Sequence, residues 1–470
     1  MKNAKRILAI LLVLLMAVSL FGCGGNAGVT SGGDASDGSD KTEVADVDFG
    51  GETVTIILEY QPSSEYGIDA SRDRELDRIK ELNKKFNVNI EMKKGPSNYN
   101  EAIVSSISSG SPIGHVIRVN GNKNYDFIRA GLCAPLNDAM QKTGIDMTAP
   151  HYDQRTNKYY NVNGNQYIAA YFIPQESLVM DLWFYNKDIL VELGYGANYI
   201  HELYEAGKWN WTTATELLKK ATKTDANGTV VRYGLGCSWL HWTTTSMITA
   251  NGGQLGSVAA DGSPKANFTD PKVREALQQM YEWGAVEKVL VPTESDETYT
   301  KFNMGEIFML SSQSGRARQC FSSGINFGVI YPPKGKSNDK NVVSMRVGSG
   351  FIIPVTYKEK ADKLLVLMDA LYSEYEDASR EDILKADQIN YFTDKESWNV
   401  VKNATFDTSI QSNDSFTVFN LEWANPAFGT ICQNLVKGTI TAGGLVESYN
   451  DQYQALLDDL FKDCKLTGVK

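Results

Sequence analysis

The sequence predicts an α/β protein, because strand-like and helix-like segments alternate along the chain. Val54–Leu58 is rich in β-branched residues and has no Pro or Gly, which is typical of a strand. A helical repeat of apolar residues follows over Asp73–Phe86, with Leu76, Ile79 and Leu82 near one face. Such alternation favours parallel sheets with helices on both faces.

The alternation continues, and two helices carry start signals. Asp270 is expected to cap a helix whose first residue is Pro271, and Thr213 with Glu216 is expected to form a capping box. Further strands are expected at Val88–Ile90 and His115–Val119, and further helices at Glu101–Ser108, Phe127–Ala130, Ala361–Leu371 and Tyr453–Phe461.

Residues 1–22 are predicted to be a signal peptide. Basic residues precede an apolar run, Ile7–Leu20, that is short for a hydrocarbon layer of about 30 Å. The run leads into the letters LFGC, which resemble a bacterial lipobox and predict lipidation at Cys23. An ordinary secretory signal with an incidental cysteine is the alternative. Residues 23–50, rich in Gly, Ser and Asp, are expected to form a flexible tether.

Composition bounds the class of protein. After the tether the 470-residue chain retains about 420 residues, enough for two domains with sizeable cores. The formal net charge is −11 and no basic stripe occurs, so nucleic acid is not an expected partner. The cysteines after Cys23 are scattered and lack metal-ligand spacing, so they are expected to be buried small hydrophobes, with one disulfide left open. They are Cys133, Cys237, Cys320, Cys432 and Cys464.

Motifs for catalysis are missing from the sequence. The four histidines show no metalloprotease spacing, and there is no nucleophile elbow, phosphate loop or dinucleotide fingerprint. Asp225-Ala-Asn227-Gly228 is expected to be a β-turn rather than a calcium loop. The chain is therefore expected to be no enzyme and to need no metal or cofactor, although catalysis by paired carboxylates stays open.

A series of landmarks follows along the chain in this order: Tyr185–Asp188, Leu193–Gly194, the helix after Trp209, Tyr233–Gly236, Asn251–Gly253, Asp270–Pro271, Phe302–Met309, Asn326–Pro332 and Gly348–Pro354. In this order they resemble the sugar-type family of bacterial extracellular solute-binding proteins, family 1. One departure concerns a loop that usually carries an aromatic residue in that family and here reads Gly315-Arg316-Ala317-Arg318.

The resemblance implies a two-lobe fold of the periplasmic-binding-protein type II (Venus flytrap), with several hinge crossovers. Lobe I would hold residues 51–175 plus 327–374, and lobe II residues 176–326 plus 375–470. The crossings are expected near Gln175–Asp181, near Ile325–Phe327 and after the Ala361–Leu371 helix. Closure would then be a rigid-body rotation around a trapped ligand.

Three tryptophans are the predicted stacking groups for a sugar. Recognition of a pyranose needs flat aromatic faces and planar polar groups. Trp239 and Trp242 lie past a predicted strand end, and Trp242 falls near a position where the family presents a stacking aromatic. Trp423 is a further candidate. Packing in the core is the alternative for each, and it is the expectation for Trp183 and Trp283.

Polar candidates follow the predicted strands, where ligands of open α/β sheets bind. Solvated loop residues are the alternative for those of lobe I. Arg316 and Arg318 could hold hydroxyls or an acidic substituent, or form surface salt bridges. The lobe I candidates are Glu59, Tyr60 and Gln61 after the first strand, and Asn120, Asn122 and Lys123 after the third.

The resemblance implies an extracellular substrate-binding lipoprotein of an ABC importer that captures a small polar solute, most simply a mono- or oligosaccharide. Its partners would be the ligand, the ABC permease subunits and the membrane that receives the lipid on Cys23. It is expected to be a monomer on the outer face of the cell membrane of a Gram-positive bacterium. A lipid-anchored glycoside hydrolase and a sensor subunit that presents ligand to a receptor kinase are the alternatives.

Overall fold

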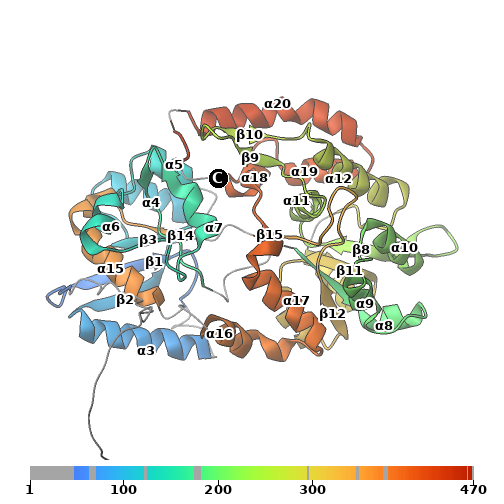
Figure 1. Ribbon diagram of the computed structural model, residues 1–470, viewed down its shortest axis with the longest axis horizontal. Coiled ribbons are helices and arrows are strands. Elements are labelled where there is room, and N and C mark those ends of the chain that lie inside the picture. Colours follow the sequence, from blue (N-terminus) through green and yellow to red (C-terminus); the bar gives the residue numbers. More distant parts are fainter. Residues whose placement is uncertain are drawn as a thin grey trace, which may run out of the picture. The chain divides into compact units, whose positions relative to one another are not determined.

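Two main β-sheets, lying well apart, organise the described part of the chain (Figure 1). The computed structural model describes residues 47–62, 70–120, 124–173, 181–293, 296–345, 349–373, 379–462 and 464–467. All of them belong to the unit Val44–Lys470. The predicted signal peptide, Cys23 and nearly all of the tether lie outside the described residues.

The first sheet has the strand order β14-β3-β1-β2. Strand β1 runs parallel to both β2 and β3, which confirms the three strands predicted near the start of the folded chain. Strand β14 comes from much later in the sequence and pairs antiparallel with β3. The bounds are β1 (Thr53–Leu58), β2 (Asn89–Lys94), β3 (Val116–Val119) and β14 (Gly350–Ile352).

The second sheet has the order β12-β6-β11-β8-β7. Strands β8 and β11 are parallel, whereas β6 is antiparallel to both β11 and β12. The bounds are β6 (Leu182–Asn186), β7 (Lys223–Thr224), β8 (Val230–Cys237), β11 (Ile307–Ser312) and β12 (Phe327–Ile330).

Two expectations about these sheets are wrong. Both sheets are mixed rather than parallel, because each contains a strand, β14 in the first and β6 in the second, that runs antiparallel to the strands beside it. The chain reaches these two strands from outside their own sheet, so no strand–helix–strand crossover makes them parallel to their neighbours. Strand β12 pairs along its length with β6, so Phe327–Ile330 belongs with the second sheet. The crossing expected near Ile325–Phe327 therefore lies beyond Ile330. The division of the remaining residues into lobes stays a prediction.

Helices surround each sheet, and Figure 1 shows the two groups on either side of β15. With the first sheet lie α3 (Ala70–Lys85), α4 (Tyr99–Ser108), α5 (Asn124–Arg129), α6 (Asn137–Thr143), α7 (Gln154–Asn157), η1 (Lys158–Tyr160), η3 (Val355–Lys360), α15 (Ala361–Tyr372) and α16 (Ser379–Gln388). With the second sheet lie α8 (Lys187–Glu192), α9 (Tyr199–Glu205), α10 (Trp211–Ala221), α11 (Leu240–Ala250), α12 (Pro271–Tyr281), η2 (Glu282–Val286), α13 (Asp296–Asn303), α14 (Arg316–Ser322), η5 (Ile389–Tyr391), α17 (Lys395–Phe406), η6 (Thr408–Ile410), α18 (Ser415–Val418), η7 (Leu421–Trp423), α19 (Phe428–Val436) and α20 (Ala442–Leu460).

Three short two-stranded ladders complete the fold, and the end of the chain docks on two of them. They are β4 (Asn161–Val162) with β5 (Asn165–Gln166), β9 (Gly256–Val258) with β10 (Pro264–Ala266), and β13 (Val343–Ser344) with β15 (Gln411–Ser412). The amide of Asn163 donates to the carbonyl of Lys465 at 2.8 Å, and the amide of Leu466 donates to the carbonyl of Gly262 at 3.4 Å. The last described residues thus contact both the β4–β5 turn and the β9–β10 turn.

The predicted helix starts are confirmed at α12 and wrong at α10. Asp270 accepts a hydrogen bond from the amide of Lys272, with Pro271 at the first helical position. Helix α10 instead begins after Asn210, whose side chain accepts from the amide of Thr213 while the Thr213 hydroxyl accepts from the Asn210 amide. The capping box therefore lies one turn before the predicted one, because Asn caps as well as Ser or Thr.

Aromatic packing around Tyr125 joins the two sheet regions. Tyr125 of α5 lies 5.5 Å from Phe419 and 4.8 Å from Phe461, measured between ring centroids. Tyr159 completes the group at 6.1 Å from Phe419. These rings extend one hydrophobic core from the first sheet into the second, while a separate core covers the other face of the first sheet.

The smaller predictions about loops and cysteines are confirmed. The Asp225 carboxylate accepts from the amides of Asn227 and Thr229 at 2.9 and 2.8 Å, which closes a turn at this point. None of the five cysteines in the described ranges forms a disulfide; Cys464 is half-buried and the other four are buried, as expected for small apolar side chains.

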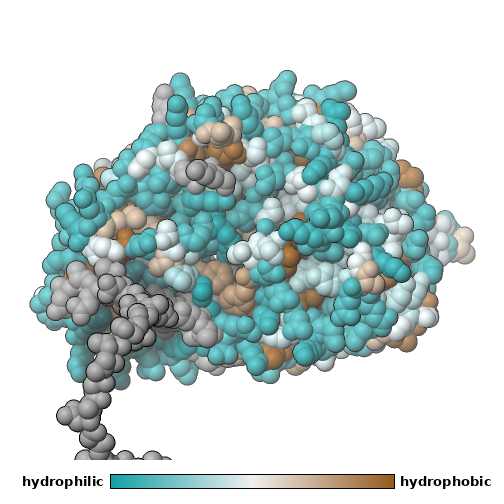
Figure 2. Space-filling model, in the orientation of Figure 1, coloured by the Kyte–Doolittle hydropathy of each residue, from teal (hydrophilic) through white to brown (hydrophobic). Residues whose placement is uncertain are grey.

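The face of the molecule that Figure 2 shows is mostly hydrophilic, with apolar residues in small separate patches. Single exposed apolar side chains of this kind are normal for a folded protein. Within the described ranges, no helix combines the length and the apolar character needed to cross a bilayer.

The α10 cap yields a stability prediction. Asn210→Ala removes the side-chain oxygen that accepts from the amides of Thr212 and Thr213, so the free energy of unfolding should fall by about 1 kcal/mol. Urea denaturation measures the change. Asn98→Ala is the matched control, since Asn98 precedes α4 without a side-chain cap. Equal losses in both variants would show that the cap contributes nothing specific.

Candidate functional site

The carboxyl ends of β8 and β11 form the edge on which the candidate site is built. These strands are parallel and pair through Ser311 and Cys237 at this end. Immediately beyond Cys237 the chain turns at Ser238 into α11, so the first turn of this helix lies over the edge of the sheet. Ligands of open α/β sheets bind outside this edge.

Three tryptophans gather there, and we call them the indole cluster: Trp239, Trp242 and Trp423. The Trp239 ring centroid lies 5.5 Å from that of Trp242 and 5.9 Å from that of Trp423, with the ring planes inclined at 50° and 71°. Trp423 is 49% exposed, and the other two are partly exposed. The inclined rings give a surface with more than one flat apolar face.

The other five tryptophans are buried and serve the core. They are Trp183, Trp209, Trp211, Trp283 and Trp398. The expectation of core packing is thus confirmed for Trp183 and Trp283. The core alternative is excluded by exposure for Trp423, the most accessible of the eight.

Two buried residues that the sequence analysis did not single out contact the indole cluster. His241 is buried, and its ring lies 4.9 Å from that of Trp423 and 5.6 Å from that of Trp242. Glu422 is also buried, and its carboxylate accepts a hydrogen bond from Trp242 Nε1 at 3.4 Å. A single histidine and a single glutamate carry no motif, but each is adjacent in sequence to a predicted tryptophan. That adjacency is the signal that could have found them.

A buried polar network anchors the start of α11 to the sheet. Thr243 Oγ1 lies 2.8 Å from Ser311 Oγ, and Ser238 Oγ lies 2.8 Å from Ser312 Oγ. The Ser311 hydroxyl donates to the carboxylate of Asp181, at the start of β6. Four segments from β6, β8, β11 and α11 are thereby joined by side-chain hydrogen bonds away from water, where such bonds are costly to break.

Burial raises the pKa of Asp181 to about 7, against the opposing effect of the hydrogen bond from Ser311. The shift arises because the charged carboxylate loses its hydration inside the protein. The native state therefore holds this proton more tightly than the unfolded chain does, and the linked stability is greatest at low pH.

The described lobe I candidates also meet at one place. Asn120 Nδ2 donates to both carboxylate oxygens of Glu59, at 3.1 and 2.9 Å, so the ends of β3 and β1 are bridged. The guanidinium of Arg118 lies 4.7 Å from the centroid of the exposed Tyr60 ring. Gln61 is exposed beside them. Asn122 and Lys123 lie outside the described residues.

The arginine candidates lie on α14. The Arg316 guanidinium lies 5.0 Å from the centroid of Tyr299, and Arg316 also donates to Gln319 at 3.0 Å. Both contacts are with α13 and α14 themselves. Arg318 is exposed. These two contacts of Arg316 serve local packing, and a ligand role for the two arginines stays a prediction.

No cluster of three or more His, Cys, Asp or Glu side chains suited to a metal ion occurs in the described ranges. The site consists of aromatic faces, amides, hydroxyls and carboxylates. Such groups can enclose a polar solute and satisfy its hydroxyl groups.

Known proteins share this architecture. Residues 70–374 match the family described as bacterial extracellular solute-binding protein. Comparison with curated protein sequences gives no match.

Solved structures cover most of the chain at low identity. An ABC substrate-binding protein from Listeria monocytogenes in complex with cycloalternan is 15% identical, with a TM-score of 0.58, over 87% of this chain and 98% of that one. A maltose/maltodextrin-binding domain from Bdellovibrio bacteriovorus bound to maltotriose is 14% identical, with a TM-score of 0.56, over 87% and 99%. UgpB from Mycobacterium tuberculosis in complex with glycerophosphocholine is 14% identical, with a TM-score of 0.61, over 87% and 98%.

The fold is therefore that of the two-lobe binding proteins, as the resemblance in the sequence implied. The family match covers more than half of the chain. The protein belongs to the bacterial extracellular solute-binding protein family.

The Asp181 pKa yields a prediction on pH. Asp181 is protonated in both states at about pH 3, and the native state alone holds the proton between about pH 4 and pH 7, so its contribution to stability declines across that interval. Asp181→Asn should therefore gain stability relative to the unaltered protein as pH rises from about 4 to 8, by on the order of 1 to 3 kcal/mol. Chemical denaturation at both pH values measures this.

The exposed Asp77→Asn variant controls for loss of one negative charge. If the difference between Asp181→Asn and the unaltered protein were the same at both pH values, the raised pKa would be refuted.

Proposed function

We propose that the protein is the substrate-capturing component of an ABC importer and binds a small polar solute, most simply a mono- or oligosaccharide, on the indole cluster. The observation that carries this proposal is the clustering of all three partly exposed tryptophans over the carboxyl edge of the second sheet. Two of the similar solved structures contain a bound sugar, cycloalternan in one and maltotriose in the other.

The chemistry of the indole cluster suits a sugar. A pyranose presents C–H groups on its faces and hydroxyl groups on its rim, so it needs flat apolar surfaces and hydrogen-bond partners together. Inclined indoles can contact two faces or two adjacent rings. Trp242 has its Nε1 bonded to Glu422, and the orientation of its ring is thus restrained before ligand arrives.

Polar groups at the end of the first sheet are available to form hydrogen bonds with the hydroxyl groups on the rim of the sugar. The Glu59 carboxylate and the Asn120 amide are already bonded to each other, and each has further acceptor or donor positions. Such planar groups hold vicinal hydroxyls in a bidentate manner. We assign Tyr60 and Gln61 to the same rim because both follow β1 at its carboxyl end.

The catalytic alternative is less favoured by the local bonding. A glycoside hydrolase needs two carboxyl groups about 5 to 10 Å apart across the bond that is cleaved. Glu59 is bonded to Asn120, and Glu422 is buried against Trp242. Both carboxylates thus already hold neighbouring side chains in position, which is a binding or structural task.

The remaining parts of the proposal concern location and partners. Cys23 would carry the lipid, and the Gly/Ser/Asp-rich residues 23–50 would let the protein stand off the membrane of a Gram-positive cell. Two permease subunits would receive the ligand-bound monomer. A binding protein that changes conformation with ligand allows them to distinguish the loaded form from the empty form.

Loss of one stacking face is the sharpest test of the indole cluster. Trp242→Ala should weaken binding of the best sugar in a screen by about 1 to 3 kcal/mol, or roughly 5- to 150-fold, by analogy with other ring-stacking sites. Titration calorimetry measures the affinity. Phe321→Ala removes another partly exposed aromatic, on α14, and should leave affinity unchanged.

Binding without turnover is the second expectation. The ligand found in the screen should reduce the radius of gyration in small-angle X-ray scattering, because the lobes rotate around it. It should also be recovered chemically unchanged. New reducing ends in the mixture would contradict the binding role and favour the hydrolase.

A further inference from the structure

A pocket lies away from the indole cluster, where α7 and η1 of the first sheet region face β9, β15 and α18. It has a volume of about 400 Å³, within the range of small-molecule sites. Helix α11 separates the two places. Trp242 lies in its first turn, and the pocket residue Gln254 lies beyond its end, roughly 15 Å further along the axis.

The lining of this pocket is cationic and rich in neutral hydrogen-bonding groups. It contains the cations Arg155 and Lys158, the amides of Gln254, Gln411 and Asn413, and several serine and threonine hydroxyls. Of the described residues that line it, none is a carboxylate. We call it the Lys158 pocket.

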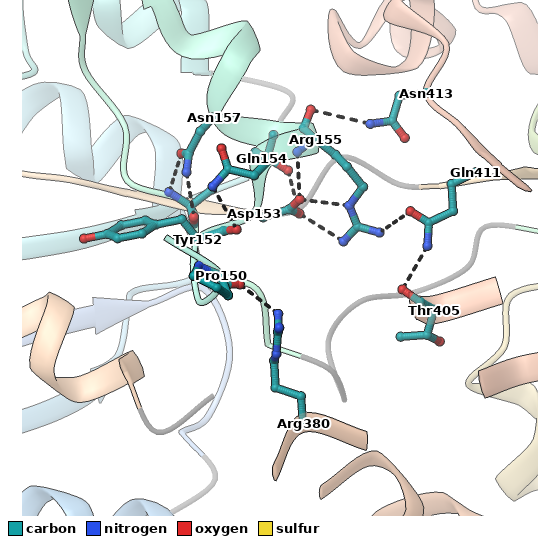
Figure 3. A network of polar contacts seen from close by, with 12 residues as sticks. Pro150, Tyr152, Asp153, Gln154, Arg155, Asn157, Arg380, Thr405, Gln411 and Asn413 are labelled. Carbon is teal, nitrogen blue, oxygen red and sulfur yellow. Dashed lines mark hydrogen bonds and ion pairs between the residues drawn. The ribbon is translucent and has the colours of Figure 1, made fainter. Parts of the chain in front are cut away.

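The charge of Arg155 is already compensated. Its Nε and Nη2 face the buried carboxylate of Asp153 at 2.9 and 3.3 Å. Figure 3 shows the remaining Nη1 directed across the gap to the amide oxygen of Gln411, at 3.2 Å. Asn413 donates to the Arg155 carbonyl at 3.5 Å. These two hydrogen bonds link the two sides of the pocket.

The charge of Lys158 is not compensated. Its ammonium lies 5.1 Å from the centroid of Tyr159, and within the described ranges it makes no ion pair or hydrogen bond. The nearby carboxylate of Asp414 is buried and accepts instead from the amides of Gly256 and Phe416. Partial burial lowers the pKa of Lys158, as expected for an ammonium that loses water and gains no anion.

We propose that the Lys158 pocket is a second binding site, for a small oxyanion such as the phosphate or carboxylate group of a polar metabolite. The oxyanion would accept from the Lys158 ammonium and from Arg155 Nη1, and the amides and hydroxyls of the lining would bind its remaining oxygens. The uncompensated ammonium of Lys158 supplies positive charge for such an anion. The site is independent of the sugar site proposed above.

The test uses the purified full chain, inorganic phosphate and acetate, with ionic strength held constant by sodium chloride. At least one of the two anions should raise the melting temperature in a saturable manner. Binding of phosphate alone would assign a phosphate group, and binding of acetate would assign a carboxylate. Saturation by neither would overturn the proposal.

Matched variants locate the site. Lys158→Met should weaken anion binding at least tenfold, and Lys158→Arg, which keeps the charge, should retain it. Lys85→Met is the control, because Lys85 also lies over the ring of the next residue, 5.2 Å from the centroid of Phe86. An equal loss in Lys85→Met would mean that surface charge alone attracts the anion.

A third variant fills the pocket and keeps both cations. Ser257→Trp should abolish anion binding, and persistence of binding would indicate an adventitious ion only. The sugar affinity of each variant, followed through tryptophan fluorescence, should remain that of the unaltered protein. If no sugar bound, the anion measurements would still test the Lys158 pocket. If no anion bound, the sugar screen would still test the indole cluster.

Discussion

The hydrogen bond between Ser311 and the buried Asp181 is the constraint on which the candidate site depends. Ser311 is the penultimate residue of β11, Asp181 directly precedes β6, and Ser311 also bonds Thr243 in the first turn of α11. Polar groups buried without partners are costly, so the three segments are held in one arrangement. Because Trp239 and Trp242 occupy the same turn as Thr243, this interaction sets where their rings lie relative to the sheet.

Much of the local structure could be predicted because its determinants are local. The β-branched run of β1, the apolar repeat of α3 and the Asp270–Pro271 start of α12 act over a few residues. Strand direction was mispredicted because β6 and β14 pair with partners far away in sequence. Nothing within Phe327–Ile330 itself indicates that β12 joins the second sheet, since a strand has the same pattern on either sheet.

The candidate site divides in the same way. Trp239 and Trp242 lie three residues apart at the start of one helix, so their proximity follows from sequence spacing. Trp423 joins them only through tertiary structure, because η7 must pack beside α11. Whether Arg316 faces a ligand or a neighbour could not be predicted, since that depends on Tyr299 of α13. Side-chain partners of this kind are decided by packing.

The docking of the last described residues has a mechanical consequence. Leu466 is bonded to Gly262 in the β9–β10 turn, while its neighbour Lys465 is bonded to Asn163 in the β4–β5 turn. One sheet region cannot rotate away from the other with both bonds intact. This pair of bonds limits the directions in which the two sheet regions can move apart, and a rotation around a ligand has to keep both bonds or break one of them.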